Sequence, residues 1–150
     1  MIPADQSAAA QTETLTLEFE LNHSPAKVWR ALTTPEHLSE WLLPVANFQL
    51  QPGAQFTFRA PQSFADWDGK VSCRMVEIES HRKLSYTWDV PFLQTVVTFE
   101  LTPTETGTRL SVVQSGFKPG QKRELGGARY GWRMMGERLV ELLDRMDHTA

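Results

Sequence analysis

The chain has little that could crosslink it or hold a metal ion. Cys73 is the only cysteine among 150 residues, so no disulfide can form within the chain and nothing points to an oxidising compartment. The four histidines are scattered, and no H-x-H, H-E-x-x-H or Cys/His spacing places two ligands together. The sequence therefore predicts no metal site and no bound cofactor.

Long apolar runs and a surplus of one charge are also missing. No apolar stretch approaches the roughly 20 residues of a membrane span, and the N-terminal residues have neither the basic start nor the apolar block of a secretory signal. The net charge is −3, and the 15 Lys and Arg are spread along the chain rather than gathered as a nucleic-acid site requires. We therefore expect a cytoplasmic protein that binds neither nucleic acid nor membrane, with a disordered tail over residues 1–13 before a single domain over residues 14–147.

The same helix-start signal occurs twice, ten residues apart. Ser24 and Thr34 can each cap a helix, and Pro25 and Pro35 occupy the first helical positions, where the missing N–H costs nothing. A short apolar stripe follows each cap and includes Trp29 in the first helix and Trp41 in the second. Stripes this short need packing for stability, so both tryptophans are predicted to be structural.

Alternating apolar residues predict strands on both sides of this helix pair. Leu15–Leu21 precedes it, and a hairpin over residues 46–60 is expected to turn at Pro52-Gly53, with Phe48 and Leu50 in its first strand. A long strand over residues 67–79 changes parity near Met75, which predicts a β-bulge there. Three further alternating segments follow, at Leu84–Trp88, Val97–Leu101 and Leu110–Gln114.

The C-terminal stretch, residues 121–146, changes to a helical period, with apolar residues recurring at spacings of three and four. One long helix after a run of antiparallel strands predicts an α+β domain of two layers, in which six to seven strands curve around that helix. We expect Leu15–Leu21 to pair with the strand containing Leu110–Gln114 or with its neighbour, and the terminal helix to cross the concave face.

These elements carry a family resemblance. The residues that match, in order, are Ser24-Pro25-x-x-Val28-Trp29-x-Ala31-Leu32-Thr33, Trp41-Leu42-x-Pro44, Pro52-Gly53-x-x-Phe56-x-Phe58, Leu84-x-Tyr86-Thr87-Trp88, Val97-x-Phe99-x-Leu101, Gly107-Thr108-Arg109-Leu110, Ser115-Gly116-Phe117 and Gly131-Trp132. The chain resembles the homologues of the activator of Hsp90 ATPase, within the Bet v 1/START-like (SRPBCC) helix-grip superfamily. The resemblance implies an apolar cavity between sheet and helix that binds a small hydrophobic or aromatic molecule, with a stress-related role.

One departure from the family pattern bears on function. An apolar residue is usual four residues after the helix tryptophan, where this chain has Gly136. Glycine inside a helix costs about 1 kcal/mol relative to alanine. It suggests either a close backbone approach or room on the face that covers the sheet.

Ten residues are candidates for lining the cavity. They are Phe56, Phe58, Trp67, Tyr86, Trp88, Phe99, Gln114, Met134, Met135 and Gly136. Aromatic residues at one parity on strands are also what an ordinary core looks like, and a polar Gln on an apolar face more often makes a structural hydrogen bond than it orients a ligand. The core and the binding interpretations both stay open at this stage.

No catalytic constellation stands out. There is no G-x-S-x-G elbow, and Cys73 in mid-strand is expected to be a buried, inert thiol. Asp66 and Asp68 flank Trp67, and His37 and Glu40 share a helical turn, but solvated pairs explain both. Ligand binding is therefore the leading hypothesis. The alternatives are an interaction with an Hsp90-type chaperone and a cyclase- or lyase-like enzyme that uses the same cavity.

Overall fold

A computed structural model of the chain describes residues 13–60 and 68–146. Its elements are β1 (Glu13–Leu21), α1 (Pro25–Thr33), α2 (Pro35–Trp41), β2 (Val45–Ala46), β3 (Gln55–Arg59), β4 (Lys70–Glu79), β5 (Lys83–Val90), β6 (Leu93–Pro103), β7 (Thr108–Phe117) and α3 (Lys122–Arg145). Residues 1–12 of the predicted tail lie outside the described residues, and Glu13 already belongs to β1.

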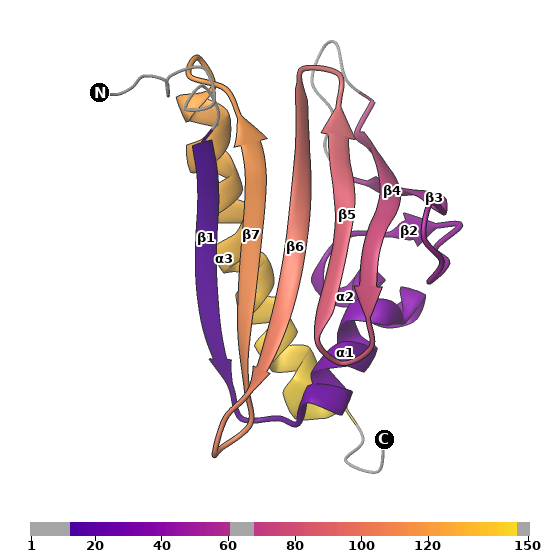
Figure 1. The fold of residues 1–150 in the computed structure, drawn as a ribbon, viewed down its shortest axis with the longest axis vertical. Coiled ribbons are helices and arrows are strands. Elements are labelled where there is room, and N and C mark those ends of the chain that lie inside the picture. The colour runs from indigo at the N-terminus through magenta and orange to yellow at the C-terminus, as the bar shows by residue number, and fades with distance from the viewer. Residues whose placement is uncertain (1–12, 61–67, 147–150) are drawn as a thin grey trace.

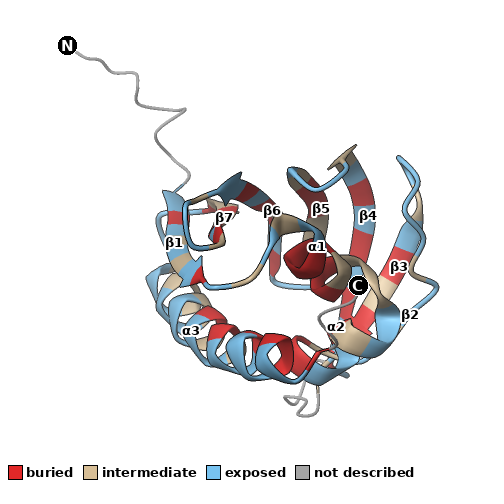
Figure 2. Ribbon diagram, turned by 90° about the horizontal axis from the view of Figure 1, so that it is seen from below, coloured by how far each residue is buried: buried red, intermediate tan, exposed pale blue. Residues whose placement is uncertain are grey.

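The strands form one antiparallel sheet in the order β1-β7-β6-β5-β4-β3-β2. Figure 1 shows α3 running behind the strands, and Figure 2 shows the sheet curving around the side on which the three helices lie. This is the helix-grip arrangement that the sequence predicted. Among the described residues, no helix has the length and apolarity that crossing a membrane would require.

The two predicted helix starts form α1 and α2. The Ser24 hydroxyl accepts a hydrogen bond from the backbone N–H of Lys27 at 3.2 Å, whereas Thr34 begins α2 without a side-chain cap. Trp41 is 2% exposed and donates its indole N–H to the carbonyl of Ala31 at 2.9 Å. Trp29 is buried as well. The prediction that both tryptophans pack into the structure is confirmed.

The first strand pairs as expected. β1 lies antiparallel to β7, with Leu15 opposite Gln114 and Phe19 opposite Leu110. The predicted bulge is present, because the pairing of β4 with β5 shifts register between Met75 and Glu77.

The predicted hairpin is only partly correct. The turn at Pro52-Gly53 forms, closed by a hydrogen bond from Ala54 N to Gln51 O, and Gly53 has φ of 82°. The strand expected before that turn is wrong, because β2 contains only Val45 and Ala46. Asn47 takes a left-handed φ of 65°, which ends the strand. Phe48 then packs its ring on Phe56 from an irregular loop, and Leu50 is exposed.

Candidate functional site

Four of the predicted cavity residues form a buried aromatic cluster on the concave face. Phe56 and Phe58 on β3, Tyr86 on β5 and Phe99 on β6 are each at most 2% exposed. The rings of Phe56 and Tyr86 lie 5.0 Å apart between centroids, and those of Tyr86 and Phe99 lie 5.9 Å apart. Edge and tilted contacts at these distances are typical of well-packed aromatic pairs. The side chains therefore fill much of the space that the sequence left open for a cavity.

Trp88 forms the half-buried edge of this cluster. Its ring lies 5.3 Å from Phe58 on one side and 5.7 Å from Trp132 of α3 on the other. Trp132 also meets Phe99, with centroids 5.8 Å apart. Trp132 is thus the helix residue that closes the cluster. The sequence marked it as part of the family pattern but did not place it among the lining residues.

Gln114 makes structural hydrogen bonds rather than facing an empty site. Its Oε1 accepts the indole N–H of Trp132 at 2.8 Å, and its Nε2 donates to Thr95 Oγ1 at 2.9 Å. Thr95 donates in turn to the carbonyl of Trp88 at 2.9 Å. This buried chain connects α3, β7, β6 and β5, and it satisfies both ends of the amide that an apolar face would otherwise leave unpaired.

The hydroxyl of Tyr86 is different, because it is buried and has no hydrogen-bond partner among the described residues. Burial, with a smaller contribution from Cys73, raises the pKa of Tyr86 well above its ordinary value, so the group stays a neutral O–H. Burial likewise raises the pKa of the Cys73 thiol, which keeps it protonated and inert as predicted. A hydroxyl buried without a partner typically costs about 1–3 kcal/mol.

The predicted helix residues do not gather around these rings. Met134 is 39% exposed and Met135 is half-buried. Gly136 is buried against Phe19 of β1, and a Cβ placed there would lie 2.7 Å from Phe19 Cζ. Of the two explanations for this glycine, close approach is the correct one. Trp67 lies outside the described residues.

The comparison with protein families decides which group this arrangement belongs to. A family model described as "Activator of Hsp90 ATPase homolog 1-like protein" matches residues 22–144. The chain belongs to this family. No curated protein matches the chain at a significant level.

Solved structures with the same fold come from several bacteria. Protein MLL2253 from Mesorhizobium loti is 42% identical with a TM-score of 0.82, over 90% of this chain and 99% of that one. Protein NE0264 from Nitrosomonas europaea is 29% identical with a TM-score of 0.72, over 88% and 94% of the two chains. Protein BH1534 from Bacillus halodurans is 27% identical with a TM-score of 0.73, over 87% and 96%.

Reactive groups in this Hsp90-activator-like domain are dispersed. Within residues 13–60 and 68–146, no three His, Cys, Asp or Glu side chains come together as metal ligands would. Glu40 pairs with Arg145 of α3 at 3.3 Å, and the His23 ring pairs with Asp144 at 3.0 Å. These contacts link α2, and the turn between β1 and α1, to the end of α3. The feature that points to ligand chemistry is therefore the aromatic cluster with its unpaired hydroxyl.

Proposed function

We propose that this family member binds a small hydrophobic or aromatic molecule between the aromatic cluster and α3, and that the Tyr86 hydroxyl donates a hydrogen bond to it. The observation that carries the proposal is the unpaired Tyr86 O–H among apolar rings. An apolar molecule with one acceptor atom would satisfy that hydroxyl and bury its own rings against Phe56 and Trp88. Sites of this kind combine an apolar lining with a few placed polar groups.

The half-buried edge of the aromatic cluster supports a path by which a ligand could reach the Tyr86 hydroxyl. Trp88 keeps partial exposure beside Trp132, and no residue between Lys122 and Gly131 of α3 is buried. That part of the helix packs on the core through side chains that are only partly buried, such as Leu125 and Ala128, and segments with little buried surface open locally at lower free energy. The START-like fold commonly binds hydrophobic ligands, which favours the same site. The chaperone and enzyme hypotheses rest on family resemblance alone.

The test compares two probes that differ by one hydroxyl, p-cresol and toluene. We expect saturable shifts of the Trp88 and Trp132 indole signals in ¹H–¹⁵N spectra, with Trp29 as an internal control because it packs against His81 instead. Wild type should bind p-cresol about tenfold more tightly than toluene, as one buried hydrogen bond is worth roughly 0.5–1.5 kcal/mol.

The matched variant is Tyr86→Phe, which should abolish the preference for p-cresol while leaving toluene binding unchanged. In the free protein it removes an unsatisfied polar group, so urea denaturation should show equal or higher stability. If neither compound moves the Trp88 and Trp132 signals at near-millimolar concentration, ligand binding at this cluster is refuted. An interaction with an Hsp90-type chaperone would then be the leading hypothesis for the function.

A further inference from the structure

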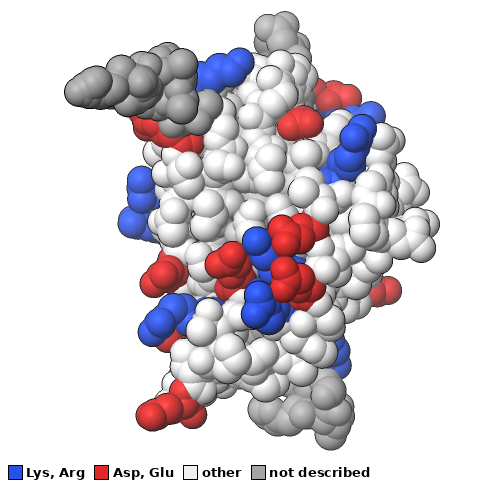
Figure 3. All heavy atoms as spheres, viewed as in Figure 1, with Lys and Arg blue, Asp and Glu red and all other residues white. Residues whose placement is uncertain are grey.

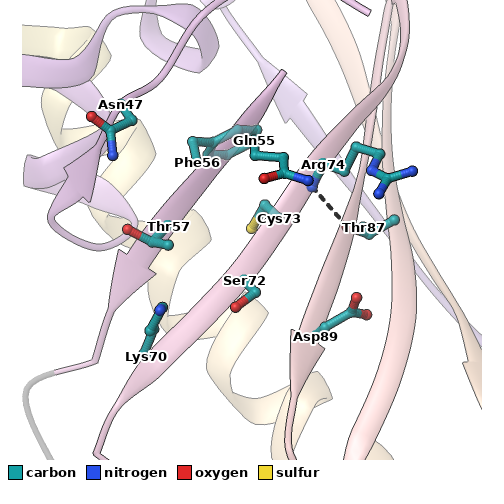
Figure 4. Close-up of a pocket in the computed structure, with 10 residues that line it drawn as sticks. All are labelled: Asn47, Gln55, Phe56, Thr57, Lys70, Ser72, Cys73, Arg74, Thr87 and Asp89. Atoms are coloured by element: carbon teal, nitrogen blue, oxygen red, sulfur yellow. Dashed lines mark hydrogen bonds between the residues drawn. The ribbon is translucent and has the colours of Figure 1, made fainter. Parts of the chain in front are cut away.

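A hollow lies on the face of the sheet opposite the aromatic cluster. It has a volume of about 620 Å³ and opens over β3, β4 and β5, with α3 behind the strands (Figure 4). We call it the outer hollow. Its lining residues are Asn47, Gln55, Phe56, Thr57, Lys70, Ser72, Cys73, Arg74, Thr87 and Asp89. The size falls within the range of roughly 300–1,000 Å³ that small-molecule sites occupy.

The hydrogen-bond ladder between β4 and β5 is irregular beside the outer hollow. Ser72 pairs with Asp89 and Met75 pairs with Tyr86, so the register sets Arg74 opposite Thr87, although no ladder pairing joins Cys73 or Arg74 to β5. The backbone N–H of Arg74 bonds instead to the Thr87 hydroxyl at 2.8 Å. A side chain thus replaces a backbone acceptor where the ladder is interrupted. Ser72, one of the residues that line the hollow, has a small side chain that occupies little of its volume.

The charged residues that line this space are Lys70, Arg74 and Asp89, and the last two carry opposite charges without pairing with each other. Arg74 lies diagonally across from Asp89 in the register, a separation of roughly 7–8 Å between Cα atoms. Figure 4 shows both side chains directed over β5 with Thr87 between them. None of the ion pairs recorded for the described residues joins them.

Elsewhere on the same face, opposite charges do pair. Lys83 lies 3.3 Å from Glu77, and Arg109 lies 2.6 Å from Glu20. Figure 3 shows acidic and basic side chains lying next to one another in the lower half of the view. The pKa of Asp89 is raised by partial burial, which a backbone hydrogen bond from Thr95 only partly offsets. Partial burial thus makes the charged form of Asp89 less favourable than it would be in water.

We propose that the outer hollow binds a small zwitterion with a free amine and a free carboxylate, such as an amino acid or a short peptide. Asp89 receives the ammonium group and the Arg74 guanidinium receives the carboxylate. Charge-assisted hydrogen bonds of this type are stronger than neutral ones, and guanidinium matches a carboxylate with two parallel bonds. The Thr57 and Ser72 hydroxyls stand in one row with Asp89 across three strands, and they offer donors and acceptors to the peptide part.

The experiment titrates glycine, glycylglycine and triglycine and follows the backbone amides of residues 72–74 and 87–89 by ¹H–¹⁵N spectroscopy. Saturable shifts should be largest for the peptide whose termini span the two charges. N-acetylglycine lacks the ammonium group and glycinamide lacks the carboxylate, so each should bind at least about tenfold more weakly. Equal binding of a capped compound, or no saturable shift with any of the three, would overturn the proposal.

Matched variants locate the site. Arg74→Gln and Asp89→Asn should each weaken zwitterion binding by about tenfold or more. Arg82→Gln changes an exposed arginine that pairs with Glu79, and it should leave binding unchanged. Unchanged affinity in both Arg74→Gln and Asp89→Asn would refute the assignment even if a peptide binds elsewhere. The p-cresol shifts at Trp88 and Trp132 report the other face, so each proposal fails or stands independently.

Discussion

The two halves of α3 form one continuous helix but relate to the sheet in opposite ways. Residues 122–131 contain no buried residue, and added Cβ atoms on Gly126 and Gly127 would meet nothing within 4 Å. From Trp132 onward the helix is anchored at regular intervals. Its buried residues are Trp132, Gly136, Leu139, Leu142 and Leu143.

The difference shows that packing, not helix propensity, fixes α3 in place. Three glycines in the first half lower its propensity and have no close contact to explain them except at Gly131, which a Met135 methyl approaches. In the second half Gly136 is required, because Phe19 occupies the place of its missing side chain. The same residue type thus loosens one half and allows close approach in the other. We expect the first half to open at lower free energy than the second.

The largest effect should come from removing the anchor at the boundary between the halves. Trp132→Ala deletes a buried indole and leaves the Gln114 amide oxygen without its donor, so stability should fall by roughly 3–5 kcal/mol. Urea denaturation measures this. Tyr130→Ala, two residues earlier and 68% exposed, is the control and should stay within about 0.5 kcal/mol. Equal losses of stability in the two variants would contradict the conclusion that the two halves of α3 pack differently on the sheet.

An intermediate effect is expected at the close contact with β1. Gly136→Ala places a methyl group against the Phe19 ring, and overpacking of this kind costs about 1–3 kcal/mol. That cost should exceed the gain of about 1 kcal/mol that alanine offers a helix. Phe19→Leu removes the ring atoms in the way, so the double variant should lose less than the sum of the two single changes. Strict additivity in this double-mutant cycle would show that contact with Phe19 is not the reason that alanine destabilises the protein at position 136.

The smallest effect should have the opposite sign. Gly126→Ala adds a methyl group into open space, so the helix should gain roughly 0.5–1 kcal/mol from propensity alone. Slower hydrogen exchange of the amides in residues 122–131 would accompany the gain. A loss of stability would mean that this half packs more closely than its exposure indicates.

Prediction from sequence succeeded where local signals acted alone. The Ser24-Pro25 start, the bulge near Met75 and the turn at Pro52-Gly53 are each specified by neighbouring residues, and each is present. It failed for the strand around Phe48 and Leu50, whose alternation suits a strand as well as an exposed loop. The left-handed backbone conformation of Asn47 ends the strand and makes the following segment a loop. The spacing of apolar residues in the sequence does not reveal that conformation.

The candidate site divides in the same way. Parity along the strands correctly placed Phe56, Phe58, Tyr86 and Phe99 together in the interior. It carried no information on which polar groups would find partners. Gln114 is satisfied by Trp132 and Thr95, whereas the Tyr86 hydroxyl has no partner among the described residues. That difference involves side chains on four separate elements.

The sequence by itself determined the family, the order of the elements and the face that each strand buries, because capping, turn chemistry and alternation act over a few residues. Only the tertiary structure decided that Phe19 fills the space at Gly136, that Tyr86 lacks a partner among the described residues, and that Arg74 and Asp89 line one hollow without pairing with each other. These features depend on distances between residues far apart in the chain. Such distances are set by how whole elements pack, which no local pattern encodes.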